Sequence, residues 1–376
     1  MTLADLGWDE GFSAAFQPWA DNGWIPARLI RDNKISCGAL WVDEDEDCFQ
    51  EAEVVLSGKV WHDAETDADL PAVGDWVALD IPEEDGADIV IRARLPRRTC
   101  FSRKAPGQST EEQVIAANVD RVIVVTDPGP DYNPRRLERY FTLIDRSGAA
   151  CLVVLNKADL HGEDHIDQCV AEIQSMHPAA TVHVTSVITD QGFKALRAQI
   201  EPGSSTCFIG SSGVGKSAMI NRLLGGDFQW TSEVNPVTGK GRHTTTAREL
   251  MVLRGGGIVI DNPGIREVHL WTDESTLRER FADISAIATE CQFHDCKHGG
   301  DRGCAIRAAV TEGRLDARRY QAFLKLEEEI AHLRQRRKKR QMTVERRGKR
   351  ERKVVARVRE DRTDHERDLT PRARDW

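Results

Sequence analysis

The stretch Gly210-Ser-Ser-Gly-Val-Gly-Lys-Ser217 decides how the middle of this chain folds. It follows an apolar run at residues 206–209 and opens a stretch with helical character at residues 217–224. Gly-x4-Gly-Lys-Ser between a strand and a helix is a phosphate-binding loop, because its glycines let backbone amides approach phosphates and the helix N-terminus favours negative charge. In such a loop Lys216 reaches the terminal phosphates and the Ser217 hydroxyl contacts Mg²⁺.

A second motif, Asn156-Lys-Ala-Asp159, lies upstream of this loop and ends the apolar run 151–155. The Asp159 carboxylate can accept hydrogen bonds from N1–H and the 2-amino group of guanine, and adenine offers neither donor. We expect Asn156 to hold the loop and contact the base edge, and Lys157 to lay its stem over the purine. An ordinary GTPase has its phosphate loop first, so the reversed order predicts a circularly permuted GTPase domain.

Further segments complete the predicted nucleotide site. We expect Asp261 of Asp261-Asn-Pro-Gly264 to hold Mg²⁺ through water. Residues 239–246, Gly-Lys-Gly-Arg-His-Thr-Thr-Thr, are the expected first switch, in which one threonine closes over Mg²⁺ and the γ-phosphate. A second guanine loop is expected at Thr185-Ser186-Val187, where the run 182–185 ends. The predicted nucleotide contacts are Asn156, Lys157, Ala158, Asp159, Ser186, Val187, Gly210, Ser211, Ser212, Gly213, Val214, Gly215, Lys216, Ser217, Ala218, Thr244, Thr245, Thr246, Asp261 and Gly264.

The catalytic machinery is less evident than the binding loops. Where Ras-type enzymes carry the glutamine that orients the attacking water, this chain has Ile265, so we expect slow intrinsic turnover. His243, beside the switch threonines, is the internal candidate for positioning water, with Lys216 assisting at the phosphates. The alternatives are that His243 is a surface residue and that a partner supplies the missing group.

Three of the nine cysteines crowd into a metal-ligand pattern, Cys291-x4-Cys296-x-His298-x5-Cys304. Three thiolates and one imidazole suit a closed tetrahedral Zn²⁺ site, and with no open position the metal should be structural. His294 is a rival fourth ligand by spacing. The other cysteines are scattered, which is typical of reduced thiols in the cytoplasm.

The spacing of apolar runs predicts a multidomain chain. Short runs at residues 25–30, 37–42, 53–60, 75–81 and 88–95 suit a small β-barrel such as an OB-fold, and an SH3-like barrel would have much the same pattern. From about residue 110, apolar runs alternate with helical stretches such as 135–147, which predicts a doubly wound α/β sheet. The expected parts are an extension of weak periodicity (1–24), the barrel (25–105), the permuted P-loop GTPase domain (106–275), a mainly α zinc-binding domain (276–333) and a basic, disordered tail (334–376).

Charge is distributed unevenly along a chain whose formal net charge is −9. Residues 334–359 are rich in Lys and Arg, with Glu345 and Glu351 as the only acids, and such an arm suits a polyanion. A second basic face is predicted on the barrel from Arg92, Arg94, Arg97, Arg98, Arg103 and Lys104. Trp41, Trp61 and Trp76 are either core residues or platforms for stacked bases. We expect no secretory signal and no membrane span.

Together these segments resemble the ribosome small-subunit-dependent GTPase A family. The resemblance covers roughly residues 25–330 and rests on the permuted order, the phosphate loop, the 239–246 segment, Glu112-Gln-Val-Ile-Ala-Ala-Asn-Val-Asp-Arg-Val122, Val73-Gly-Asp-Trp-Val77 and the late Cys/His pattern. Two positions, Val187 and Asn262, depart from the family's usual residues, and neither is an expected side-chain ligand.

The resemblance implies an N-terminal OB-fold, a permuted GTPase domain and a C-terminal zinc domain in which His298 is the fourth ligand. It also implies a role in late maturation of the small ribosomal subunit, with GTP hydrolysis stimulated by that subunit. We further expect a cytoplasmic monomer that binds GTP or GDP with Mg²⁺ and contacts the 30S subunit and its 16S rRNA. Two alternatives stay open: an RNA-binding assembly scaffold in which GTP only gates binding, and a permuted GTPase of large-subunit assembly. Because the 261–264 loop leads into the zinc domain, we also expect nucleotide state to bias that domain's pose.

Overall fold

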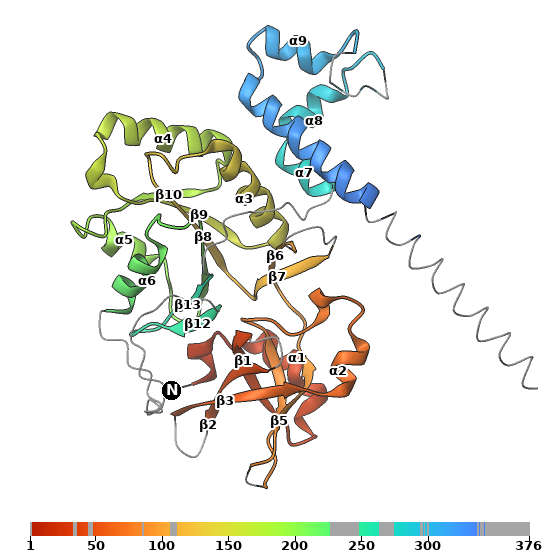
Figure 1. Cartoon of the computed structure of the whole chain (residues 1–376), viewed down its shortest axis with the longest axis vertical. Coiled ribbons are helices and arrows are strands. Elements are labelled where there is room, and N and C mark those ends of the chain that lie inside the picture. The colour runs from red at the N-terminus through yellow and green to blue at the C-terminus, as the bar shows by residue number, and fades with distance from the viewer. Residues whose placement is uncertain are drawn as a thin grey trace, which may run out of the picture. The chain divides into compact units, whose positions relative to one another are not determined.

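The computed structural model describes residues 2–32, 36–43, 48–84, 86–105, 111–225, 248–262, 274–293, 296, 298, 301–336, 338 and 342 (Figure 1). Contacts divide the chain into two units, residues 1–326 and 327–376. Everything below concerns the first unit unless stated. In the second unit, residues 327–336 are helical.

The predicted barrel is present and closed. Its strands are β1 (Ile25–Asp32), β2 (Cys37–Asp43), β3 (Cys48–Leu56), β4 (Trp76–Asp80) and β5 (Ile89–Arg94). They pair in the ring β1-β2-β3-β5-β4-β1, with only β3 and β5 parallel, so every strand has two neighbours. Alternate side chains, among them Leu29, Val54 and Ile91, fill the interior. This closure removes free sheet edges and confirms the barrel expectation.

One predicted strand was too long. The run 53–60 was expected to be extended, but β3 ends at Leu56 and the short helix α2 (Gly58–Asp63) follows. Ser57 caps this helix, since its hydroxyl accepts a hydrogen bond from the Val60 amide at 3.3 Å. A side-chain cap outweighed the β-propensity of Val60.

The N-terminal segment is a folded part of the structure rather than an extension of weak periodicity. It forms the 3₁₀ turn η1 (Leu3–Leu6) and helix α1 (Glu10–Ala20), with Asp9 as the helix cap. The Trp8 ring packs 4.7 Å from that of Trp76, and both Phe12 and Phe16 are buried. Trp76 is therefore a core residue and not a platform for bases.

The predicted α/β sheet is also present. In spatial order its strands are β10 (Thr181–Val184), β9 (Ala150–Leu155), β8 (Arg121–Thr126), β11 (Ser205–Ile209), β13 (Ile258–Asp261) and β12 (Glu249–Val252). All are parallel except β12. Helices α5 (Phe193–Ala198) and α6 (Lys216–Leu224) pack on one face through a shared apolar core that includes Ile123, Val125 and Phe208. Helix α3 (Pro134–Ser147) contacts β8 and β9, and α4 (Glu163–Met176) contacts β10.

A two-stranded element that the sequence did not predict lies beside α3. It consists of β6 (Cys100–Lys104) and β7 (Glu112–Ala117), paired antiparallel. Arg146 of α3 binds both Glu112 and the Ser102 hydroxyl at 2.8 Å. The Glu112–Val122 motif therefore spans β7 and the start of β8, and it links the barrel to the nucleotide-binding sheet.

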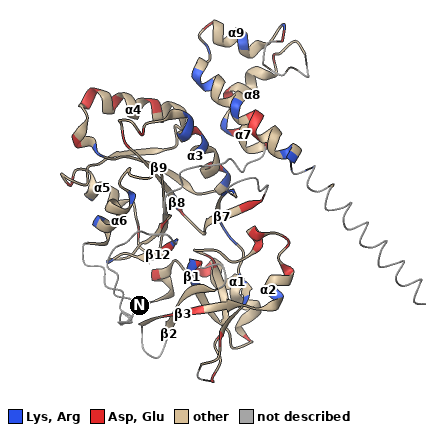
Figure 2. Ribbon diagram, in the orientation of Figure 1, with Lys and Arg blue, Asp and Glu red and all other residues tan. Residues whose placement is uncertain are grey.

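The predicted basic face of the barrel is interrupted, because acidic partners neutralise three of its arginines. Arg97 forms a buried ion pair with Asp75 at 2.6 Å, Arg92 pairs with Asp80 at 2.6 Å, and Arg98 pairs with Asp9. Figure 2 shows acidic segments interspersed with basic ones over the barrel. The described barrel surface has no uniform positive field for a polyanion.

The C-terminal part of the first unit is mainly helical, as predicted. It comprises α7 (Glu274–Arg280), α8 (Ala282–Ala288), α9 (Ala305–Thr311) and a helical stretch at residues 317–326. Arg280 of α7 binds Glu138 at 2.7 Å and Asp145 at 2.9 Å, both on α3. His177 contacts the other oxygen of Asp145 at 2.9 Å. We call these four residues the Arg280 cluster, and it fastens α7 to the GTPase domain.

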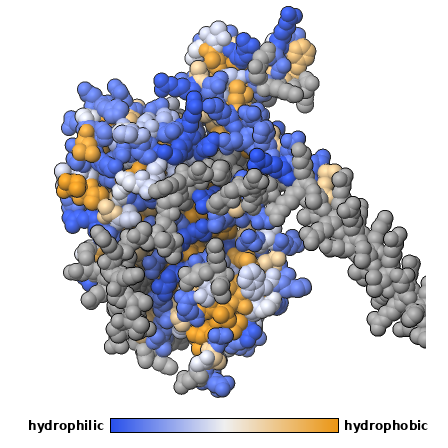
Figure 3. Space-filling model, viewed as in Figure 1, coloured by the Kyte–Doolittle hydropathy of each residue, from blue (hydrophilic) through white to orange (hydrophobic). Residues whose placement is uncertain are grey.

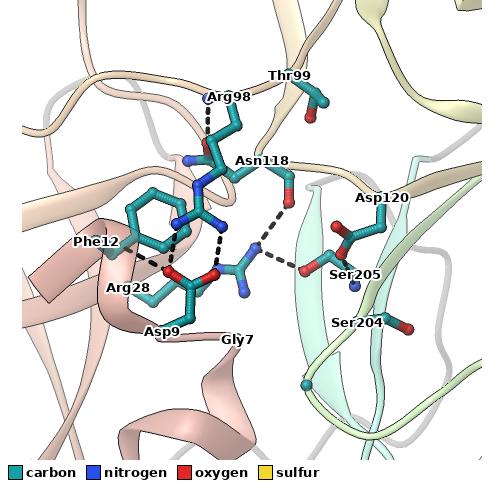
Figure 4. A pocket seen from close by; sticks show the side chains of 11 residues that line it. Gly7, Asp9, Phe12, Arg28, Arg98, Thr99, Asn118, Asp120, Ser204 and Ser205 are labelled. Atoms are coloured by element: carbon teal, nitrogen blue, oxygen red, sulfur yellow. Dashed lines mark hydrogen bonds and ion pairs between the residues drawn. The ribbon is translucent and has the colours of Figure 1, made fainter.

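Arg28 of β1 joins the barrel, the N-terminal segment and the GTPase sheet (Figure 4). Its fully buried guanidinium donates to the carbonyls of Leu6, Gly74 and Asn118 and to the Ser205 hydroxyl at the start of β11. Burial lowers the pKa of Arg28 to about 10, and the charges of Asp120 and Asp75 oppose that shift. The small cavity beside it, about 230 Å³, also has Asp9 and Arg98 on its wall.

No helix among the described residues has both the length and the apolar character needed to cross a bilayer. Figure 3 shows a mostly hydrophilic visible face, with apolar areas on the barrel, on the α4/α5 side of the sheet and on the C-terminal helices.

Candidate nucleotide site and metal centre

The predicted nucleotide-binding loops leave the sheet at one edge. Because β8, β9, β10, β11 and β13 are parallel, the loops that follow them all emerge at the carboxyl ends. From β8 the chain proceeds through β9 to β10, and β11 then lies on the other side of β8. That reversal is a topological switch point, where α/β sheets bind ligands.

The phosphate loop connects β11 to α6, as the sequence predicted. Gly210, Gly213 and Gly215 all have positive φ, at 143°, 85° and 102°. A Cβ atom at Gly210 would collide with the Val125 carbonyl of β8. Only glycine therefore allows the loop to lie this close to the neighbouring strand.

Lys216 is the first residue of α6 and its ammonium lies inside the loop. Its Nζ donates to the carbonyls of Gly210 at 2.8 Å and Ser211 at 2.7 Å. Burial lowers the pKa of Lys216, whereas Asp261 and Asp131 partly offset that effect. A buried ammonium held by two neutral carbonyls is poised to take phosphate oxygens, which are stronger acceptors.

The predicted guanine-reading loop is tied directly to the phosphate loop. The Asn156 side chain donates from Nδ2 to the Val214 carbonyl at 2.8 Å and accepts from the Thr185 hydroxyl at 3.3 Å. The Ala158 amide donates to the Thr185 carbonyl at 3.0 Å. The structure thus brings together three loops that are far apart in the sequence, and Thr185, the first residue of the expected second guanine loop, joins them.

Two apolar side chains stand exposed beside these loops. Leu160 directly follows Asp159 and is 68% exposed, whereas Ile188 follows the buried Ser186 by two residues and is 85% exposed. Asp159 is exposed as well. The apolar faces of a planar base would cover exposed side chains such as Leu160 and Ile188.

Asp261 ends β13, and its surroundings fit a cation. The residue is buried, and its Oδ1 atom has no hydrogen-bond partner among the described residues. Burial raises the pKa of Asp261, and the charge of Lys216 partly offsets that rise. A buried carboxylate oxygen without a partner beside a phosphate loop is suited to a Mg²⁺-bound water. Ser217 and Ala218, in the first turn of α6, are exposed and accessible to the same ligand.

Several predicted site residues lie outside the described residues. They are the water-positioning candidate, the switch threonines, the glycine of the 261–264 loop and the rival zinc ligand: His243, Thr244, Thr245, Thr246, Gly264 and His294.

The Cys/His pattern converges in space. The ligand atoms of Cys291, Cys296, His298 and Cys304 all lie within 4.8 Å of one another. His298 Nδ1 is 3.6 Å from Cys291 Sγ and 3.8 Å from Cys304 Sγ. In a tetrahedral site with ordinary Zn–S and Zn–N bonds, sulfur and nitrogen ligands stand about 3.6 Å apart. The arrangement therefore fits a four-coordinate structural metal.

Two backbone features hold His298 in place. Its φ is 58°, in the left-handed region, and its carbonyl accepts a hydrogen bond from the Tyr320 hydroxyl. A strained backbone conformation at a ligand is typical of a residue whose position is set by its function.

Comparison with known proteins identifies the family. A protein named small ribosomal subunit biogenesis GTPase RsgA from Opitutus terrae is 44% identical over 340 residues, which cover 88% of this chain and 90% of that protein. The chain belongs to the RsgA GTPase family. The family model described as RsgA GTPase matches residues 94–271, and an RsgA from Syntrophotalea carbinolica is 42% identical over 88% of this chain and 90% of its own length. Family membership makes the protein a GTP hydrolase.

Solved structures agree with the fold. YjeQ from Thermotoga maritima has a TM-score of 0.57 at 24% identity, over 82% of this chain and 99% of its own. YloQ, whose title calls it a circularly permuted GTPase, has a TM-score of 0.55 at 21% identity, over 82% and 96%.

A second family model, described as a 50S ribosome-binding GTPase, matches residues 205–346. That range starts at the strand before the phosphate loop and excludes the guanine-reading loop at 156–159, which precedes it here. The match covers the phosphate loop and continues past the Cys/His cluster.

Proposed function

We propose that this RsgA-family GTPase binds GTP and Mg²⁺ at the carboxyl edge of the β8–β13 sheet and hydrolyses GTP while it takes part in late maturation of the small ribosomal subunit. The relatives above carry small-subunit biogenesis in their names. The observation that carries the nucleotide site is the hydrogen bond from Asn156 to Val214, because it joins the two halves of a permuted motif set.

The roles of the residues follow from the geometry. Asp159 reads the guanine edge, Asn156 holds the phosphate loop at a set distance from the base, and the amides of residues 210–217 cradle the phosphates. Lys216 exchanges its two loop carbonyls for phosphate oxygens. Ser217 and Asp261 hold Mg²⁺, which neutralises charge that develops on the phosphates during transfer.

Slow intrinsic hydrolysis is part of the proposal. Ile265 cannot orient water, so His243 or a group supplied by the ribosomal particle does so. Turnover of His243→Ala with and without the small subunit separates these sources. A loss of stimulated turnover would show that His243 orients the attacking water. Unchanged stimulated turnover would remove His243 from the mechanism.

The test of the whole proposal is GTP turnover by the protein alone, with small subunits and with large subunits. Stimulation confined to the small subunit is the expected result. Stimulation by the large subunit alone would favour the second candidate, to which the description of the 205–346 model points. A variant that binds GTP but cannot hydrolyse it should stall on the small subunit; normal release would favour a scaffold that GTP merely gates.

Finer assignments belong to the same proposal. The metal at Cys291, Cys296, His298 and Cys304 is Zn²⁺, the protein acts as a monomer in the cytoplasm, and residues 334–359 contact 16S rRNA. If each basic residue in that arm neutralises one phosphate, log affinity falls with log salt by roughly 0.7–0.9 per contact. Removal of residues 334–376 should flatten that slope.

A further inference from the structure

A buried carboxylate at the guanine edge has no assigned role. Asp127 directly follows β8, and its side chain is 7% exposed. One of its oxygens, Oδ2, lies 3.1 Å from Nζ of Lys157 in the guanine-reading loop. The sheet register explains this contact. Thr126 of β8 pairs with Leu155 of β9, so the residues that follow these two strands lie side by side.

The direction of the Asp127 carboxylate is set by its own turn. Its Oδ1 accepts hydrogen bonds from the Gly129 amide at 2.8 Å and the Asp131 amide at 3.4 Å. Pro128 and Pro130 restrict the turn further, because each fixes its own φ. Since Oδ1 is engaged by the turn, Oδ2 remains for Lys157.

Lys157 is held in an unusual conformation. Its φ and ψ are 61° and 35°, which places a long side chain in the left-handed region. A lysine side chain has high rotamer entropy, so a free ammonium would sample many positions. The ion pair with Asp127 restricts the stem to one path between the loop and the buried carboxylate.

We infer that Asp127 is a positioning residue for guanine binding: it anchors the Lys157 ammonium so that the aliphatic stem is already aligned to cover the purine face. The inference rests on the proposed function, because it takes residues 156–159 as the guanine-reading loop. Preorganised contacts bind more tightly, since the ordering cost has been met before the ligand arrives. Asp127 acts on the base end of the nucleotide, and not on the phosphates.

The test compares Asp127→Asn with the native protein by equilibrium binding and release of fluorescent GDP and a non-hydrolysable GTP analogue. Asparagine keeps an oxygen for the Gly129 and Asp131 amides but removes the charge that holds Lys157. We expect the affinity for both nucleotides to fall by the same factor, about 3- to 10-fold, mainly because release becomes faster. The KM of the GTPase reaction should rise while kcat stays unchanged. Asp80→Asn, which removes a carboxylate of the Arg92 ion pair on the barrel, is the matched control and should change neither value.

A double-mutant cycle shows whether Asp127 acts through Lys157. Lys157→Met keeps the apolar stem and removes the ammonium, without touching the Asp127 turn. In that background Asp127→Asn should have no further effect on GDP affinity. An undiminished second effect would overturn the inference, as would a loss confined to the GTP analogue or a fall in kcat with KM unchanged.

Failure of the proposed function is distinguishable from failure of this inference. Native protein that takes up ADP as well as GDP would refute guanine reading itself, before any variant is compared. Native protein that prefers GDP, together with an Asp127→Asn variant of native affinity and native thermal stability, would refute only the role of Asp127.

Discussion

At the scale of single residues, the predicted nucleotide site depends on how closely the phosphate loop approaches the backbone of β8, as much as on its functional groups. Gly210 lies so close to β8 that a methyl group would strike the Val125 carbonyl, and the same closeness lets Asn156 reach the Val214 carbonyl across the loops. The glycines in the motif are thus steric requirements, and their role depends on strands that come from another part of the chain.

Gly210→Ala should displace the phosphate loop and weaken GDP and GTP binding by about 10- to 100-fold, because the clash is with backbone and cannot be relieved by a side-chain rotation. Gly225→Ala is the matched control: Gly225 also has positive φ, 86°, but its added Cβ would meet no atom of the described residues within 4 Å. Equilibrium binding measures both. Equal losses in the two variants would mean that left-handed strain, and not the contact with Val125, is the cause.

At the scale of elements, local signals decided some segments and packing decided others. Strands β8, β9 and β11 ended where the apolar runs end, because buried parallel strands are apolar throughout. Helix α1 was missed, although Phe12, Phe16 and Trp19 recur at helical spacing, because its stability comes from packing of its aromatic face on Trp76. Strands β6 and β7 were not predicted, because each forms its ladder hydrogen bonds only with the other, outside the main sheet.

The Cys/His segment should depend on a bound metal. Cys291, Cys296, His298 and Cys304 come together between α8 and α9, so chelation should loosen residues 282–326 locally. Cys304→Ser should lower metal affinity by at least about 10-fold. Hydrogen exchange of the apo protein checks this: protection should vanish in 282–326 and persist in the barrel. Retained protection without metal would refute a structural role.

At the scale of the whole molecule, buried cations join the parts of the first unit. Arg28 links the barrel and η1 to the start of β11, the strand whose other end opens the phosphate loop. Arg280 links α7 to α3 through Glu138, with both side chains at most 4% exposed. These ties lie away from the nucleotide loops, at the start of β11 and on α3.

Arg280→Met should destabilise the folded state by about 3–5 kcal/mol, because it removes the 2.7 Å ion pair of the buried Glu138 carboxylate and leaves only Arg319, 3.9 Å away, as a cation beside it. The double variant Arg280→Met/Glu138→Gln removes both charges and should recover part of that loss. Urea unfolding monitored in the C-terminal helices measures the difference. If the double variant were as unstable as the sum of the single variants, the charges would not be coupled.

The pH dependence of stability has a defined sign at Asp145. Burial would raise the pKa of Asp145, but the hydrogen bond from His177 and the charge of Arg280 outweigh it and hold the pKa below 3.8. A carboxyl group with a lowered native pKa stabilises the fold above its unfolded pKa, and that contribution is lost as pH falls through the native pKa. Below about pH 4, native protein should therefore lose stability more steeply than Asp145→Asn. Chemical unfolding at a series of pH values compares the two; parallel curves would contradict this.

The sequence by itself determined the chemistry of the protein: a phosphate loop, a guanine-reading loop in permuted order and a four-ligand metal motif are short, contiguous and carried by residue type. It also determined the strands of the nucleotide-binding sheet, because strands buried on both faces are continuous apolar runs in the sequence. Only the tertiary structure decided that Arg92, Arg97 and Arg98 face acidic partners. It also decided that α1 packs on Trp76 and that Asp127 forms an ion pair with Lys157. Each of these depends on which distant segments the sheet places side by side, and pairing across 22 to 89 residues of chain (Arg97 with Asp75, Arg98 with Asp9) leaves no local trace in the sequence.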